Sequence, residues 1–346
     1  MPPKSDKIPA LDGLRGVSIS LVLLAHLSGT REVTTGRRLW DLDSLGNLGV
    51  RIFFVISGFL ITLLLLNERA ATGRISLLRF YLRRLVRIFP AAYLYMAVIF
   101  LCAAGGLVVL APWDRLHALT YTVNYHHLRS WYVSHLWSLS VEEQFYLAWP
   151  ALLLMLGTRR GLWAACALVL AAPLARTGIW IWWPARRIEI GEAFSTIGDA
   201  IATGCLLAGW RARLGQSESY LRFLRSPWFV LVPLLVVAAN AVQHYAVLDF
   251  LFGQTIMNVA IALTIDRCVR IDGDWVRRLL ESRPLSTLGV LSYSLYLWQE
   301  PFLNRFSRSG VTLFPLNLLL TFAAASASHY LVERPLLQLR QRLRRA

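Results

Sequence analysis

The sequence is poor in charged residues and in cysteine, and both shortages narrow what the chain can be. Asp, Glu, Lys and Arg make up only 16% of its 346 residues, whereas hydrophobic residues make up 56% and mean hydropathy is +0.50. With 13 Trp, this balance excludes an ordinary soluble domain and indicates a polytopic membrane protein. The four cysteines, at positions 102, 166, 205 and 268, lack CxxC spacing, so they predict neither a metal site nor a disulfide framework.

Acidic residues are also scarce: 20 Asp and Glu face 36 Lys and Arg, which gives a net charge of +16. Such an excess can indicate a nucleic-acid partner. Here, however, the arginines lie mostly in short segments between apolar runs and do not form one continuous basic face. Membrane topology explains this distribution better, and we expect no nucleic-acid partner.

Internal repeats and low-complexity segments are absent, and apolar runs fill most of the chain. The sequence predicts an all-α membrane bundle of about ten transmembrane helices. Their expected ranges are 10–29, 46–67, 87–111, 136–156, 161–183, 195–210, 227–245, 247–266, 286–306 and 312–332. Lys4 and Lys7 precede the first run as in a secretory signal, but no small-residue cleavage site follows, so we expect an uncleaved first helix.

The segments that connect the expected helices alternate between many arginines and few. If the N-terminus is cytoplasmic, inner segments receive arginines 69, 74, 79, 83, 84, 159, 160, 211, 213, 222, 225, 267, 270, 277, 278 and 283 and the tail 340–345. Outer segments then keep fewer, at positions 31, 37, 38, 115, 129, 186, 187, 305 and 308. The positive-inside rule therefore predicts that both termini are cytoplasmic.

Arg15 and His26 lie eleven positions apart within the first apolar run, PALDGLRGVSISLVLLAHL. In a helix they are about 16 Å apart, roughly half the hydrocarbon thickness of a bilayer. If Arg15 sits at one membrane face, His26 is deep inside, where polar groups usually mark a substrate path or reacting site. The alternative is a snorkelling arginine beside a histidine that hydrogen-bonds a neighbouring helix.

Arginines crowd the segment RFYLRRLVRIFP, where Arg84 and Arg87 are three positions apart and share one helix face. Paired guanidinium groups bind phosphate oxygens bidentately, so this face suits a phosphorylated donor. The alternative is a positive-inside signal or a contact with anionic lipid.

The segment HLWSLSVEEQFYLAWP places Glu142 and Glu143 in an apolar run. On a helix they point about 100° apart, so only one readily faces a shared interior. A carboxylate beside a histidine orients the ring and stabilises its protonated form, as a general base requires. The alternative is an interfacial belt of Trp137, Tyr146 and Trp149 with solvated acids.

Further polar residues stand in apolar surroundings and together predict a polar interior between the helices. They are Asp12 in the first run, Arg51 in GVRIFFVISGFL, Asp199 in GDAIATG, Tyr293 and Tyr296 in LSYSLYLWQEP, and Glu333 with Arg334.

The motifs PALDGLRG with His26, FFVISGFLIT, RRLVRIFPAAY, WSLSVEEQFYLAWP, SYSLYLW and VERP occur in this order, and together they resemble the acyltransferase-3 family of integral membrane acyltransferases. The resemblance implies a single domain over residues 1–346 in the bacterial cytoplasmic membrane. It also implies transfer of an acyl group, often acetyl, from cytoplasmic acyl-coenzyme A to a hydroxyl of a glycan, lipid-linked sugar, peptidoglycan precursor or macrolide. Acyl-coenzyme A is then a donor substrate, and no permanently bound cofactor or metal is expected.

Several positions match the family's motifs individually. Arg15 and His26 match its Arg-x10-His pair, whose histidine is considered catalytic, and Glu142 matches the acid of its WSLxxE motif. Arg84 and Arg87 match the RxxR motif associated with the donor.

Other positions depart from the family's patterns. Asp199 matches the acid of an R-x-D-x-x-x-x-G pattern, but Ile197 stands at its arginine position. Gln299 replaces the histidine that some members carry in a YLWH motif, so no second catalytic imidazole is expected there. We expect no attached SGNH esterase-like domain.

These observations predict an acyltransferase with His26 as general base and Glu142 as its partner or as a substrate-orienting group. Arg15, Arg84 and Arg87 would bind the donor phosphates. Supporting or substrate-binding roles are expected of Asp12, Arg51, Trp137, Glu143, Asp199 and Tyr293. The chief alternative is a proton-coupled membrane transporter that uses the same buried residues, and a weaker one is a non-catalytic sensor.

Overall fold

The computed structural model describes residues 8–30 and 42–343. Every regular element in these ranges is helical, which confirms the predicted all-α class. Part of the charge pattern used for orientation lies outside the described residues, namely Lys4, Lys7, Arg31, Arg37, Arg38, Arg344 and Arg345.

The apolar runs form the longer helices. These are α1 (Pro9–Ser28), α2 (Asp43–Thr72), α3 (Leu77–Ala104), α6 (Leu136–Trp182), α7 (Phe194–Leu214), α9 (Leu231–Ala241), α11 (Gln254–Arg270), α13 (Arg283–Trp298) and α14 (Leu316–Ser328). Shorter helices are α4 (Asp114–Leu119), α5 (Trp131–Ser134), α8 (Glu218–Arg225), α10 (Ala246–Leu248), α12 (Trp275–Leu280) and α15 (Arg334–Leu343). Short 3₁₀ helices cover Val123–Tyr125, Pro184–Glu189, Pro227–Val230, Val242–His244 and Gly310–Thr312, and π-helical segments cover Asp249–Gly253 and His329–Glu333.

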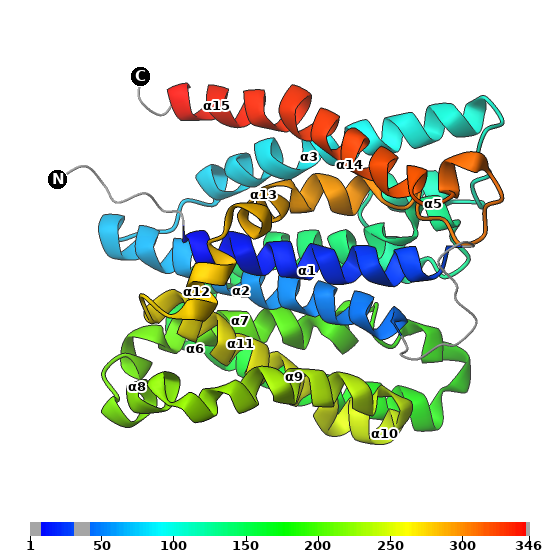
Figure 1. Ribbon diagram of the computed structural model, residues 1–346. Helices are drawn as coiled ribbons and strands as arrows, with labels where there is room; N and C mark the ends of the chain where they lie inside the picture. Colours follow the sequence, from blue (N-terminus) through cyan, green and yellow to red (C-terminus); the bar gives the residue numbers. More distant parts are fainter. Residues whose placement is uncertain (1–7, 31–41, 344–346) are drawn as a thin grey trace.

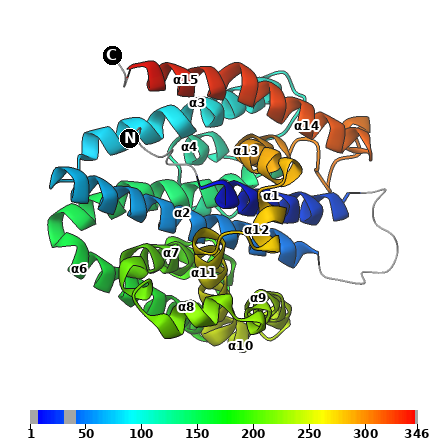
Figure 2. The same cartoon turned by 60° about the vertical axis from the view of Figure 1, so that its left-hand side comes forward.

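The long helices run back and forth along one common direction (Figure 1). One end of the bundle carries α8 and α12 together with the start of α1 and the end of α15; we call it the α8 end. The opposite end carries α5 and α10, and we call it the α5 end. Helix α1 lies centrally against α2 and α13, with α3, α14 and α15 on one side and α7 to α11 on the other (Figures 1 and 2).

Among the described residues, six helical segments are long and apolar enough to cross a membrane. One of them covers Trp131–Trp182 and is divided by Gly157, whose φ of 75° and ψ of 167° interrupt α6 between two expected spans. Helices α13 and α14 are 16 and 13 residues long, short of the roughly 20 that a span needs. The structure thus supports an integral membrane protein, and the count of about ten spans stays a prediction.

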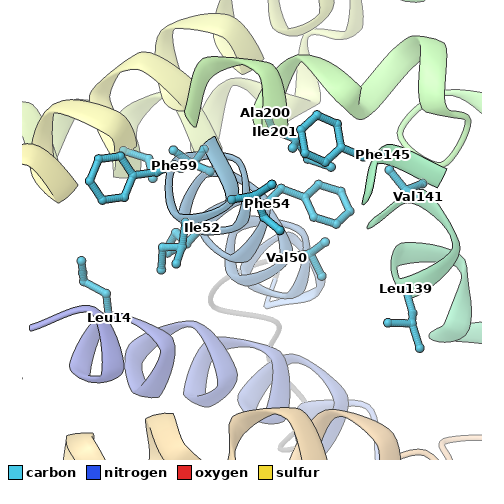
Figure 3. Close-up of a cluster of buried hydrophobic side chains, with 14 of the residues drawn as sticks. Leu14, Val50, Ile52, Phe54, Phe59, Leu139, Val141, Phe145, Ala200 and Ile201 are labelled. Atoms are coloured by element: carbon cyan, nitrogen blue, oxygen red, sulfur yellow. The ribbon is translucent and has the colours of Figure 1, made fainter. Parts of the chain in front are cut away.

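Helix α2 forms the centre of the apolar core (Figure 3). Its Phe54 and Phe59, 1% and 0% exposed, lie between Leu14 of α1 on one side and α6 and α7 on the other. Large rings that fill the spaces between helices in this way fix the helices' positions, since cores of this density tolerate little change of volume.

Two helix pairs approach so closely that glycine is required at the contact. A Cβ atom on Gly289 of α13 would lie 1.7 Å from the carbonyl oxygen of Asp12, and one on Gly58 of α2 would lie 1.9 Å from that of Ile201. Small residues at such crossings let two backbones meet, as is common in membrane helix pairs. The α1/α13 contact positions His26 and Gln299, as described below.

We predict that Gly289→Ala destabilises the protein by about 1 to 3 kcal/mol, because the added methyl forces α13 away from α1. Thermal unfolding of the detergent-solubilised protein measures the effect. Gly310→Ala is the control, since a Cβ there meets no atom within 4 Å. Equal unfolding midpoints in the two variants would contradict the close contact.

We also predict that the α5 end faces outward and the α8 end inward. In a background without the four native cysteines, an impermeant maleimide added to intact cells should label Leu128→Cys, whose native side chain is 84% exposed. Ala71→Cys, exposed at the α8 end, should react only after the cells are opened. The reverse labelling pattern would invert the orientation.

Candidate active site

A cavity of about 110 Å³ lies among α1, α2, α3, α6 and α13. Its lining combines three arginines with one carboxylate, a set of hydroxyl groups and an apolar wall. The lining residues are Arg15, Arg84, Arg87, Glu142, Ser57, Ser138, Ser292, Tyr146, Tyr293, Tyr296, Val50, Phe53, Phe54, Ile88 and Leu139. Arg15, Arg84, Arg87, Glu142 and Tyr293, which the sequence singled out separately, therefore share one cavity.

The arginines of α3 reach the cavity because of where the helix begins. Ser76 caps α3 by accepting a hydrogen bond from the backbone N–H of Arg79, 3.4 Å away. Arg84 and Arg87 then lie on one face of the helix, roughly 10 to 15 Å from its first residue at the α8 end. The guanidinium of Arg84 lies 4.5 Å from the ring centroid of Tyr146, a cation–π contact.

The charge of the cavity is positive. Arg15 forms an ion pair with Asp12 at 3.1 Å, and Glu142 lies within electrostatic reach of both Arg15 and Arg84. Three guanidinium groups facing one lining carboxylate favour an anionic ligand. Asp12 does not line the cavity, and its contribution is the ion pair with Arg15.

Glu142 and Glu143 have different surroundings, as their angular separation on α6 predicts. Glu142 accepts a hydrogen bond from the Ser57 hydroxyl at 2.6 Å and lines the cavity. Glu143 does not line it, and its buried Oε1 has no hydrogen-bond partner among the described residues. Trp137 is also outside the cavity lining, with its ring edge-on to Phe54 at 6.2 Å.

His26 lies in the last turn of α1, near the α5 end. Its Nδ1 is 3.0 Å from Gln299 Oε1, and its ring packs edge-on against Trp131 at 5.5 Å. With the amide oxygen of Gln299 assigned to this contact, the matching tautomer of His26 has its hydrogen on Nδ1 and its lone pair on Nε2. Trp131 in turn donates from Nε1 to the backbone oxygen of Glu300 at 3.0 Å.

The structure does not place Glu142 as the hydrogen-bond partner of His26, a role that the sequence analysis offered for it. Glu142 lies about 9 Å along α6 from its first residue, on the side of Arg84. Gln299, directly after α13, takes that position instead, because α13 packs along α1. The glutamine that replaces the family's YLWH histidine is thus the residue that holds His26.

Sequence reasoning also missed the carboxylate near His26. Glu300 lies within electrostatic reach of His26, and its Oε2 is 3.6 Å from Nδ1 of His135. Glu300 and His135 are 2% and 3% exposed. The available signal was the pair Gln299 and Glu300, two polar residues directly after the apolar run LYLW.

Tyr296 joins the cavity to this second cluster. Its hydroxyl donates to the backbone oxygen of His135 at 2.8 Å and lies 2.5 Å from Ser138 Oγ. Both Tyr296 and Ser138 line the cavity. The Tyr296 ring therefore lines the cavity and also packs edge-on against the ring of His135.

The other predicted polar residues form pairs elsewhere in the bundle. Arg51 donates to Asn258 at 3.2 Å and to Gln254, outside the cavity lining. Asp199 pairs with Arg176 of α6 at 2.9 Å, and both side chains are fully buried. Arg176 thus supplies a guanidinium for Asp199, which the sequence alone could not show because the two residues belong to different helices.

Tyr293 donates to the backbone oxygen of Ile88 at 2.7 Å, so it ties α13 to α3 beside the cavity. Within residues 8–30 and 42–343, no group of three His, Cys, Asp or Glu side chains is placed to hold a metal ion.

Comparison with known proteins identifies the family to which the chain belongs. The family model of an acyltransferase domain, acyltransferase-3, matches residues 8–332. The chain is 28% identical over 369 residues to a putative peptidoglycan O-acetyltransferase, YrhL, of Bacillus subtilis (strain 168), covering 95% of this chain and 55% of that protein. It is 29% identical over 367 residues to the O-acetyltransferase OatA of Staphylococcus aureus (strain NCTC 8325 / PS 47), covering 95% and 57%.

The chain spans about half the length of these curated relatives. No solved structure matches it. The family model covers nearly the whole chain, and the motif arginines, His26 and Glu142 lie in and around one polar interior. The chain therefore belongs to the acyltransferase-3 family and is an integral membrane acyltransferase.

Proposed function

We propose that the protein transfers an acyl group, with acetyl the first candidate, from cytoplasmic acyl-coenzyme A to a hydroxyl of a glycan, lipid-linked sugar or macrolide-type acceptor. One observation carries this proposal: three arginines line a cavity among the helices, and the half-buried His26 lies farther along α1 with its Nδ1 against Gln299. The names of the relatives make peptidoglycan the first acceptor to test.

The donor's phosphates fit the arginine side of the cavity. Guanidinium groups bind phosphate oxygens through paired, charge-assisted hydrogen bonds. The apolar wall formed by Phe53, Phe54 and Leu139 suits the uncharged thioester arm. About 16 Å separates Arg15 from His26 along α1, a distance that a long arm of this kind can cross.

His26 would remove the proton of the acceptor hydroxyl through Nε2 while Gln299 holds Nδ1. The acceptor oxygen then attacks the thioester carbonyl, a C–O bond forms and the C–S bond breaks. The proton passes from His26 to the sulfur of coenzyme A, so the histidine is restored. Glu142, which accepts a hydrogen bond from Ser57, would orient the donor. It would not orient His26.

Family membership favours this enzyme over the proton-coupled transporter expected as the alternative. The direct test is to supply purified protein with acetyl-coenzyme A and peptidoglycan fragments, and to measure free thiol and acetylated fragments together. Thiol release without an acylated acceptor would show hydrolysis only, and release of neither would remove the proposal for this donor and acceptor.

We predict that His26→Ala lowers the rate of acyl transfer by about 10² to 10⁴, the usual effect of losing a general base. The same thiol-release assay measures it, at acceptor saturation. His244→Ala, at an exposed histidine, is the matched control and should keep full activity. Near-native turnover in His26→Ala would exclude His26 as the base.

We predict that Arg84→Lys with Arg87→Lys weakens acetyl-coenzyme A binding by at least tenfold. Lysine keeps the charge and offers only a point donor, and each lost charged hydrogen bond is worth about 1.5 to 3 kcal/mol. Equilibrium binding of acetyl-coenzyme A measures the loss, and acceptor binding should change little. Arg79→Lys, at an exposed position of α3, is the control.

Membrane orientation should survive the double substitution, since the positive-inside rule counts charge. If the double variant binds acetyl-coenzyme A as tightly as the native protein, Arg84 and Arg87 do not bind the donor and serve only as a positive-inside topology signal.

A further inference from the structure

The surroundings of His26 contain a buried carboxylate, that of Glu300. Within the described part of the chain, three charged or titratable side chains lie within electrostatic reach of the ring: Glu300, Arg305 and His135. Arg305 is already paired, because both of its terminal nitrogens contact the Asp43 carboxylate, at 2.8 and 3.2 Å. Among these three groups, Glu300 is the only one that can carry a negative charge.

Glu300 is deeply buried and poorly satisfied. It is 2% exposed, and among the described residues its Oε2 has no hydrogen-bond partner. The ring nitrogens of His135, 3% exposed, also lack hydrogen-bond partners there, although Nδ1 lies 3.6 Å from that oxygen. A buried carboxylate without a counter-charge is costly, and a proton on a neighbouring imidazole reduces that cost.

Three elements hold the cluster rigidly, so that its geometry persists when charge appears. The Tyr296 hydroxyl fixes the backbone of His135, and Trp131 fixes the backbone oxygen of Glu300 while its ring packs on His26. The rings of Tyr95 and Tyr296 enclose His135 edge-on, at 5.2 and 5.4 Å. A preorganised charge of this kind acts most strongly in a site closed to water.

We propose that Glu300, buried beside His135 and next in the chain to the Gln299 that contacts His26, is a positioning residue whose negative charge stabilises the positive charge that His26 carries during acyl transfer. The inference rests on the proposed function, and it gives Glu300 the role that the sequence offered for Glu142. In the step itself, the O–H bond of the acceptor breaks and its proton goes to His26 Nε2. The proton then leaves His26 with the coenzyme A sulfur.

The first test compares E300Q with a variant that moves the charge by one position. E300Q removes the charge at nearly constant shape, and we expect kcat to fall at least 30-fold while KM for acetyl-coenzyme A changes little. In Q299E/E300Q the carboxylate stands directly at Nδ1 of His26, and we expect at least a tenfold recovery over E300Q. A merely structural role for Glu300 would not be rescued by relocating its charge.

The second test does not depend on the acceptor or on turnover. Neutral imidazole reacts with diethyl pyrocarbonate and protonated imidazole does not, so mass spectrometry gives the pH midpoint of His26 modification. In E300Q the midpoint should move to lower pH, because the imidazolium loses its counter-charge. The exposed His244 in the same molecule is the internal control and should keep its midpoint.

The inference is overturned if E300Q keeps kcat within threefold of the native enzyme, if Q299E/E300Q folds but is no better than E300Q, or if the His26 midpoint does not move. E300D, which keeps the charge, replaces E300Q for the labelling test if E300Q fails to fold, and it should leave the midpoint in place. If His26→Ala loses activity while E300Q keeps it, the role of Glu300 is excluded and that of His26 as general base stands. If both variants keep full activity, both roles are excluded.

Discussion

The backbone contact between α1 and α13 is the constraint on which the site depends. Gly289 meets the carbonyl oxygen of Asp12, so the two helices run together from there toward the α5 end. Asp12 holds Arg15 at the beginning of this contact, and Gln299 meets His26 at its far end. One helix pair thus sets the spacing between the arginine side of the cavity and the histidine.

Pairing of polar groups across helices follows from the membrane environment. Hydrocarbon offers no water to a guanidinium or a carboxylate, so a polar partner on a neighbouring helix stabilises such a group. Arg176 with Asp199 and Ser57 with Glu142 are two such pairs. These interactions specify which helices meet, whereas large apolar side chains such as Phe54 and Phe59 fill the core between the helices.

The sequence predicted the helical class and the residues of the cavity well, because both depend on local patterns. The spacing of Arg84 and Arg87 placed them on one face, and the angle between Glu142 and Glu143 allowed only one of them into the interior. The sequence could not predict the hydrogen bond between Gln299 and His26, since this contact joins residues 273 positions apart. Arg176 was missed for the same reason: nothing near Asp199 in the chain indicates a partner in α6.

The single ring of Tyr296 between the cavity and the His135 cluster has a consequence for side reactions. In the proposed reaction, a thioester bound among the arginines would be separated from His135 by this side chain, which two hydroxyl contacts hold in place. Water on the donor side would then meet the Tyr296 ring before the imidazole of His135. Such a partition would make wasteful hydrolysis slow for as long as the ring keeps its place.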